Sequence, residues 1–170
     1  MIARLEAGNA REAMAEFDAA EVTKGVAELY EAVADEAGAP LRVSVEELLP
    51  VRGSRELVGQ AVANLVDNAV KYGAPNREGA AAEPVTMSAS RDGDQVVITV
   101  ADHGPGIPEA ERARALERFV RLESARSRPG FGLGLSLAAA VARLHGGLLR
   151  LEDNAPGLKV VLQLPAKAPA

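Results

Sequence analysis

The stretch SRELVGQAVANLVDNAVKY, residues 54–72, decides the fold because it reads as one long amphipathic helix. Ser54 is a typical N-cap residue, and apolar residues then recur at intervals of three and four. The apolar positions are Leu57, Val58, Ala61, Val62, Leu65, Val66, Ala69 and Val70. A stripe of this width predicts a helix that is buried along one side.

The same helix has a polar face. At about 100° per residue, Gln60, Asn64, Asn68 and Lys71 fall within a narrow arc opposite the apolar stripe. Asn and Asp are mediocre helix formers, so Asn64, Asp67 and Asn68 cost stability here unless they serve a purpose. This face is either simply solvated or a ligand site, in which a carboxamide oxygen facing a phosphate could bind Mg²⁺.

Two further helices are expected. Asp18 is a suitable N-cap for a helix that runs to about Glu36, where Gly38 and Pro40 end it. The apolar stripe of this helix comprises Val22, Val26, Leu29 and Val33. Another helix is expected over Leu133–Leu144.

Alternating apolar and polar residues predict the strands, and the dipeptide Asp92-Gly93 predicts a hairpin between two of them. The strands are expected near residues 41–45, 85–91, 95–102, 148–152 and 159–164. Helices and strands are mixed rather than strictly alternating. The sequence therefore predicts an α+β fold, an α/β sandwich with one mixed, mostly antiparallel sheet of about five strands, covered on one face by about three helices.

A long connection, rich in Arg, Gly, Pro and Glu, runs from His103 to Phe131. Connections of this length are usually functional or mobile. It begins with Asp-His-Gly-Pro-Gly-Ile, residues 102–107, where a strand ends. Asp102 could accept a hydrogen bond from an exocyclic amine, and Gly104 and Gly106 would let the backbone approach a flat ring. An ordinary turn would have the same pattern.

The connection ends with Gly-Phe-Gly-Leu-Gly-Leu-Ser, residues 130–136, which opens the next helix. Glycines at a helix N-terminus bring backbone N–H groups and the positive end of the helix dipole to an anion. The alternative is a tight turn followed by close helix packing. The motif is neither a Walker loop nor a Rossmann fingerprint.

Composition narrows the class of protein. The 170 residues suit one domain, and 48% hydrophobic but only 3% aromatic residues predict a core of Ala, Val and Leu. The net charge of −5 argues against broad binding to nucleic acid. No Cys is present, which is compatible with the cytosol, and no apolar run reaches about 18 residues, so we expect no direct membrane contact from this segment.

Taken together, four motifs resemble those of the catalytic ATP-binding domain of sensor histidine kinases, in the ATPase superfamily shared with gyrase and the mismatch-repair ATPases. Residues 64–72 resemble the asparagine box, and residues 102–107 the first glycine box. Residues 117–121 resemble the phenylalanine box of the ATP lid, and residues 130–135 the second glycine box. The resemblance runs from about Phe17 to Leu164.

The resemblance implies a site for ATP and Mg²⁺. Asn68 would ligate Mg²⁺, Asn64 would lie beside the phosphates, and Lys71 would pair with a phosphate. Asp102 would accept a hydrogen bond from the adenine amine. The other residues assigned to the nucleotide are Tyr72, Gly104, Gly106, Ile107, Phe119, Gly130, Phe131, Gly132, Leu133, Gly134 and Leu135.

The catalytic assignments that the resemblance implies are Asn64, Lys71, Arg118 and Arg121, with the two arginines as alternatives for the γ-phosphate. The ATP-hydrolysing relatives usually carry a glutamate base at the position of Asn64. Because Asn cannot accept that proton, the kinase interpretation is favoured over a gyrase-like hydrolase. Phe131 stands where the family commonly has a small residue, which would reshape the lid or the phosphate end of the site.

The resemblance also implies a missing phosphoacceptor. His103 and His145 are the only histidines, and neither has the context expected of a phosphorylated histidine. His145 lies where it would cap the end of a helix. Residues 1–10 resemble the end of a dimerisation-hairpin helix. The expected organisation is therefore residues 1–10 as that helix end, 11–165 as the ATP-binding domain and 166–170 as a disordered tail.

The implied function is to bind Mg-ATP and transfer the γ-phosphoryl group to a histidine on a separate dimerisation segment, through which a response regulator is reached. The expected location is the cytoplasm, in a homodimeric parent that could be membrane-anchored, with the present chain monomeric and no nucleic acid as partner. Two alternatives remain: a serine kinase or anti-sigma-type regulator of the same superfamily, and a non-catalytic nucleotide-sensing scaffold.

Overall fold

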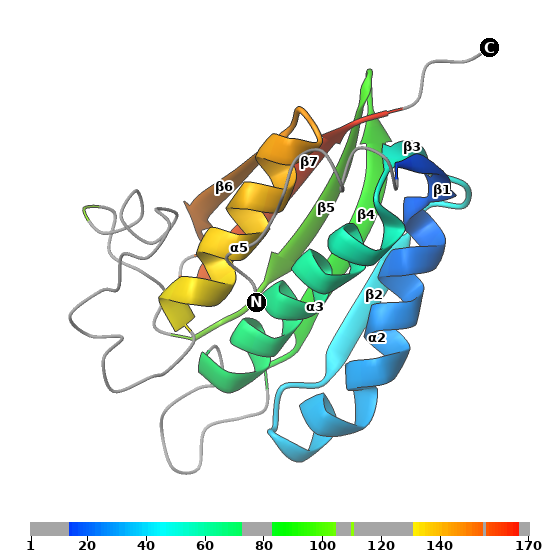
Figure 1. The fold of residues 1–170 in the computed structure, drawn as a ribbon. Coiled ribbons are helices and arrows are strands. Elements are labelled where there is room, and N and C mark those ends of the chain that lie inside the picture. Colours follow the sequence, from blue (N-terminus) through cyan, green and yellow to red (C-terminus); the bar gives the residue numbers. More distant parts are fainter. Residues whose placement is uncertain (1–13, 73–82, 105–109, 111–130, 155, 167–170) are drawn as a thin grey trace.

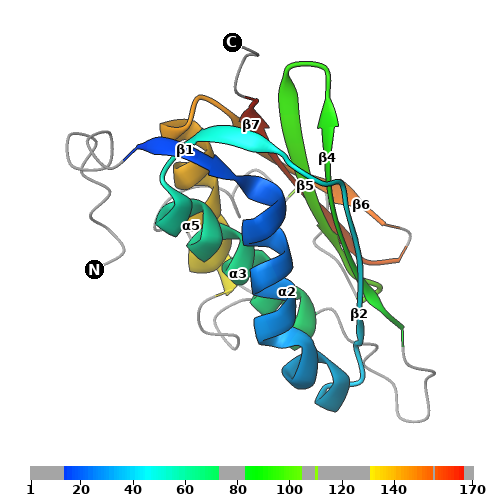
Figure 2. The same cartoon turned by 90° about the vertical axis from the view of Figure 1, so that its right-hand side faces the viewer.

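The computed structural model describes residues 14–72, 83–104, 110, 131–154 and 156–166, and these form two layers. One layer contains three helices, α2 (Ala19–Glu36), α3 (Arg55–Tyr72) and α5 (Phe131–Leu144), with α3 packed between the other two. The other layer is a sheet that the helices cover on one face (Figures 1 and 2). The hydrophobic core contains buried residues of both layers.

The sheet of the described residues has five strands in the order β2-β4-β5-β7-β6. Their bounds are β2 (Leu41–Val45), β4 (Val85–Asp92), β5 (Gln95–Ala101), β7 (Leu158–Pro165) and β6 (Leu148–Asp153). Only the pairing of β2 with β4 is parallel, and the other three pairings are antiparallel. The predicted α+β sandwich with a mixed, mostly antiparallel sheet is confirmed.

A second, two-stranded sheet was not predicted. It consists of β1 (Ala15–Asp18) and β3 (Pro50–Gly53), which pair antiparallel with Phe17 opposite Val51. Both of these side chains are buried. Each strand has only four residues and no complete alternation of apolar and polar positions, so periodicity could not reveal it.

The predicted starts of the first two helices are confirmed. The Asp18 carboxylate accepts the Ala20 N–H at 2.9 Å and also the Leu49 N–H at 2.8 Å, so that it fixes the approach to β3 as well as the start of α2. At α3, the Ser54 hydroxyl accepts the Leu57 N–H at 3.2 Å. Both caps satisfy backbone donors that a helix cannot pair internally.

The predicted apolar stripe of α2 is wrong in its second half. Val22 and Val26 are buried, but Leu29 is 73% and Val33 is 51% exposed. The buried side of the helix is instead rich in small residues, including Ala20, Ala27 and Ala34. Leu29 and Val33 lie at one edge of this buried side, because the helical period places its centre near Thr23, Ala27 and Ala34.

The predicted stripe of α3 is confirmed. Seven of its eight residues are buried, and Leu57 packs partly buried against them. The sheet shows the complementary pattern, since Val85, Met87 and Ala89 of β4 point into the core while the residues between them are half-buried on the other face.

Within the described helices, none is long and apolar enough to cross a membrane.

His145 joins the C-terminal end of α5 to the start of α3. Its Nε2 accepts the Ser54 N–H at 3.0 Å, so its Nδ1 carries the proton and donates to the Val141 carbonyl at 2.7 Å. The expected cap at the helix end is thus confirmed, and the bond to Ser54 was not foreseen. Gly53 lies against the imidazole ring, which a Cβ at this position would strike. We call this contact of Gly53, Ser54 and His145 the helix clasp.

A double-mutant cycle tests the helix clasp. We expect His145→Ala to lower the free energy of unfolding by about 1–3 kcal/mol, because the Ser54 N–H loses its acceptor. Gly53→Ala alone should also destabilise, by collision with the ring, and the double variant should lose less than the sum. Urea unfolding measures each term, with exposed Leu148→Ala as the control. Strict additivity would contradict the contact.

Candidate nucleotide site

Three elements meet at one end of the molecule. The C-terminal half of α3, the end of β5 and the N-terminal end of α5 lie together, at the lower left in Figure 1. Helices α3 and α5 pack against each other, and α3 also contacts β5. The structure thus gathers the asparagine-rich helix, Asp102 and the start of the glycine-opened helix, which are far apart in the sequence.

Asp102 follows β5 directly and is 7% exposed. Its Oδ1 accepts two backbone hydrogen bonds, from Gly104 at 2.9 Å and from Leu158 at 3.1 Å. Its own N–H donates to the Leu158 carbonyl at 3.0 Å. The carboxylate is therefore held in one orientation. Among the described residues both side-chain bonds use Oδ1, which leaves Oδ2 to accept from a ligand.

Residues of the loop between β6 and β7 contact the backbone carbonyl of Asp102. The sequence did not indicate this contact. Asn154 Nδ2 donates to the Asp102 carbonyl at 2.6 Å. Gly157 has φ 115°, and a Cβ on it would strike the same carbonyl oxygen. The turn residues of Asn-Ala-Pro-Gly, residues 154–157, indicate a turn, but no sequence signal connects that turn with Asp102.

Asn64 and Asn68 of α3 are both half-buried. The Asn68 Nδ2 is fully buried and has no hydrogen-bond partner in the described part of the chain. A buried amide without a partner is costly, so its presence suits a site whose ligand completes the bonding. The carboxamide also provides an oxygen ligand of the kind that Mg²⁺ takes. The residues present therefore fit a magnesium-bound phosphate.

Lys71 lies beside Asp67, with 3.0 Å between Nζ and Oδ2. The side chain of Lys71 is 58% exposed, and an ion pair this exposed contributes little to stability. Tyr30 of α2 lies near both of these charged side chains. Burial and the nearby Asp67 carboxylate raise the pKa of its hydroxyl, against the opposite effect of Lys71. The position of Tyr30 was not predicted, because it depends on how α2 packs against α3.

Helix α5 begins at Phe131, two residues before the predicted start, so the backbone of residues 131–134 is helical. The side chains of these four residues are outside the description. Leu135, which the resemblance assigned to the nucleotide, is fully buried in the core. Its position shows that α5 is anchored by packing from its second turn onward.

Several predicted site residues lie outside the described part of the structure. They are Gly106, Ile107, Arg118, Phe119, Arg121 and Gly130, together with the side chain of Tyr72. Most of the predicted lid, residues 1–10 and the last four residues of the predicted tail lie outside it as well.

The chain is similar to proteins of known class. Residues 53–168 match the family model of the histidine kinase-, DNA gyrase B- and HSP90-like ATPases. A signal transduction histidine-protein kinase/phosphatase MprB from Mycolicibacterium paratuberculosis is 47% identical over 100 residues, which are 59% of this chain and 18% of that protein. The chain spans about a fifth of the length of such curated relatives.

Solved structures agree with the sequence matches. The mycobacterial sensor histidine kinase MprB superposes with a TM-score of 0.75 at 30% identity, over 92% of this chain and 99% of that one. The ATP-binding domain of PrrB from Mycobacterium tuberculosis gives a TM-score of 0.71 at 28% identity, over 92% and 99%. Both likenesses extend over the two layers described above.

The burial of Asp102 predicts a pH dependence of stability. Burial raises the pKa of this carboxyl, and the bonds from Gly104 and Leu158 and the nearby His103 only partly oppose it. Since the folded state favours the protonated form, its contribution to the free energy of unfolding is present at acidic pH and is lost as pH rises through the raised pKa. Urea unfolding at several pH values should show this slope in the parent chain and not in Asp102→Asn.

The support behind Asp102 predicts a large effect of Gly157→Ala. A side chain at φ 115° and in collision with the Asp102 carbonyl should lower the free energy of unfolding by at least about 1–2 kcal/mol. Gly25→Ala is a matched control in α2, where a Cβ meets no atom within 4 Å. That variant should gain about 0.5–1 kcal/mol. Equal thermal stability of the two variants would contradict the prediction.

Proposed function

Because this chain belongs to the histidine kinase-, DNA gyrase B- and HSP90-like ATPase family, as the ATP-binding domain of a sensor histidine kinase, we propose that it binds Mg-ATP and supplies the γ-phosphoryl group to a histidine of another segment. The observation that carries the proposal is the buried Asp102, held by two backbone N–H groups at the end of the sheet where α3 and α5 meet. This carboxylate is oriented to accept a hydrogen bond.

The adenine end of the nucleotide is assigned to Asp102. The exocyclic amine of adenine is a donor and would bond to the carboxylate oxygen that the backbone leaves available. Guanine carries a carbonyl oxygen at the equivalent position, which the carboxylate would repel. Gly104 is buried beside Asp102 and adds no side chain that would obstruct a flat ring.

The phosphate end is assigned to α3 and the start of α5. Asn68 would hold Mg²⁺ through its side-chain oxygen, and the ion when bound would neutralise phosphate charge. Lys71 would exchange its exposed pair with Asp67 for a phosphate. The N-terminal end of α5 has backbone N–H groups that the helix itself cannot pair, and it carries the positive end of the helix dipole. The lid arginines Arg118 and Arg121 remain proposals for the γ-phosphate.

The chemistry proposed for this chain is positioning and charge neutralisation. Asn64 cannot take a proton from water as a glutamate would, so the site would protect bound ATP from rapid hydrolysis. The attacking nitrogen would come from an imidazole on a dimerisation hairpin outside this chain, held in line with the γ-phosphoryl group. Response-regulator contact, a homodimeric parent and a cytoplasmic location are part of the same proposal.

Asp102→Asn tests the nucleotide assignment. The Asn oxygen can keep both backbone bonds, but its amide would oppose the adenine amine, donor against donor. We expect ATP affinity to fall by roughly tenfold to a hundredfold, as for loss of a charged hydrogen bond, and the preference for ATP over GTP to shrink. Calorimetry with both nucleotides and Mg²⁺ measures this. Unchanged ATP affinity in a folded variant would remove Asp102 from the site.

Phosphoryl transfer is tested by mixing the chain with the histidine-bearing hairpin of its parent and labelled ATP. The product should be acid-labile phosphohistidine on the hairpin, and no label should appear on the chain alone. Asn68→Ala should abolish transfer while the unfolding midpoint is retained, because its buried amide has no described partner to lose. Acid-stable phosphoserine on a partner protein would support the serine-kinase alternative.

A further inference from the structure

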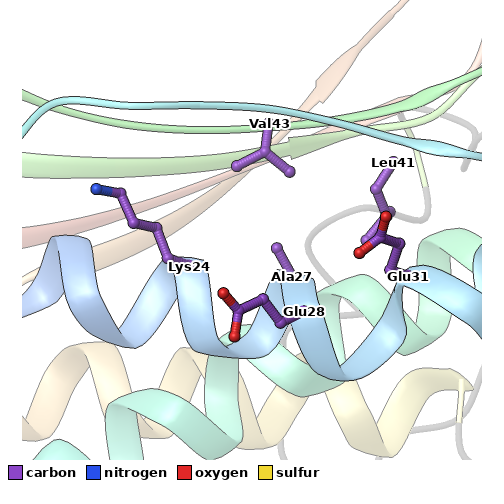
Figure 3. Close-up of a pocket in the computed structure, with 6 residues that line it drawn as sticks. All are labelled: Lys24, Ala27, Glu28, Glu31, Leu41 and Val43. Carbon is purple, nitrogen blue, oxygen red and sulfur yellow. The ribbon is translucent and has the colours of Figure 1, made fainter.

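A groove of about 320 Å³ lies between α2 and β2, at the opposite side of the helical layer from α5 (Figures 1 and 3). Its lining comes from α2 (Lys24, Ala27, Glu28 and Glu31) and from β2 (Leu41 and Val43). Ala27 lies on α2 facing β2, and the charged side chains of the lining also come from the helix (Figure 3). None of these residues belongs to the proposed nucleotide site.

One wall of the groove is an edge strand of the described sheet. Among the strands that the structure describes, β2 pairs with β4 on one side and with none on the other. The Pro40 carbonyl accepts from Val85, and the Glu46 N–H donates to Ala89, so the even-numbered residues bond to β4. In a parallel ladder the alternate residues direct both backbone groups the other way. Leu41, Val43 and Val45 therefore direct their N–H and C=O groups to the open edge.

The two sheet edges differ in how they are protected. The other edge strand, β6, carries Arg150, Glu152 and Asp153, with Arg150 paired to Glu152 at 3.2 Å. In β2 the only charged residue is Arg42, and Val43 is 42% exposed. Edge strands are usually blunted by charges or Pro. β2 is the more receptive of the two edges for an added strand.

The charges of the groove indicate what it would accept. Glu28 and Glu31 place two carboxylates along the wall opposite β2, against the single ammonium group of Lys24 at one end. A strand added to β2 would direct alternate side chains toward the helical layer, as Leu41 and Val43 do. A Lys or Arg in such a position would lay its apolar stem over Ala27 and bring its charge to the two glutamates.

We propose that the groove between α2 and β2 binds an extended basic segment of a partner protein, which adds a strand to β2 and places a Lys or Arg side chain against Glu28 and Glu31. Backbone bonds to Leu41, Val43 and Val45 supply the pairing, and the glutamates supply the preference for a basic residue. This binding is independent of ATP, so its test is separate from that of the proposed function.

The probe is a blocked peptide, Thr-Val-Thr-Arg-Thr-Val-Thr, whose Val and Arg side chains share one face when extended. The peptide is titrated into the full chain, and the NMR signals of the backbone amides of the chain are followed. We expect shifts and slower hydrogen exchange at Leu41, Val43 and Val45. Replacing the Arg of the peptide by Glu should abolish these effects.

Variants of the chain separate the two parts of the interaction. The pair Glu28→Gln and Glu31→Gln should weaken the peptide roughly threefold to tenfold, whereas Glu36→Lys, at the end of the same helix, should have a smaller effect. Val43→Pro removes an edge donor that the ladder does not use and should abolish binding, whereas Val43→Thr keeps that donor and should retain it.

Three results would overturn the proposal. The first is peptide-induced shifts that lie elsewhere or do not occur at millimolar peptide. The second is full protection of the Leu41, Val43 and Val45 amides before peptide is added, which would mean that the chain itself covers the edge. The third is concentration-dependent dimerisation, abolished by Val43→Pro, which would make a second copy the occupant.

Discussion

Helix α3 is enclosed on three sides, by α2, by α5 and by the sheet, and this enclosure determines where the chemistry can lie. A helix that buries Val58, Val62 and Val66 on one side must direct Asn64, Asn68 and Lys71 elsewhere, since the helical period fixes the angle between the two sets. The C-terminal half of α3, which carries the polar set, lies near the end of β5 and the start of α5, and Lys71 also lies near Tyr30 of α2. The core and the site are two consequences of the same packing.

The adenine-reading group depends on a different kind of support. Among the described residues, the Asp102 carboxylate is held by backbone donors, from its own loop and from β7, while Asn154 and Gly157 contact the Asp102 carbonyl. Backbone donors cannot rotate away as side chains can, so a charged group held by them remains oriented when the site is empty. Burial of this carboxylate costs desolvation free energy, and the same desolvation raises its pKa. The large aliphatic core stabilises the fold against this cost.

The features that could be predicted are those that depend on residues close together along the chain. The caps at Asp18 and Ser54, the stripe of α3 and the hairpin at Gly93 depend on residues a few positions apart. The features that escaped prediction depend on distant partners. The pairing of β1 with β3, the exposure of Leu29, the position of Tyr30 and the support at Gly157 are decided by which elements meet, and one sequence read alone does not contain that information.

The helix clasp lies at the end of the helical layer away from the nucleotide site. A small tilt of α5 about the clasp would therefore displace the N-terminal end of the helix most. With 14 residues at about 1.5 Å each, the helix extends about 21 Å from His145 to its first residue. A tilt of about 5° about the clasp would carry the first turn by about 2 Å, on the scale of a hydrogen bond made or broken. The point about which such a tilt would occur is the imidazole of His145, and the far end is the first turn of α5, near the end of β5.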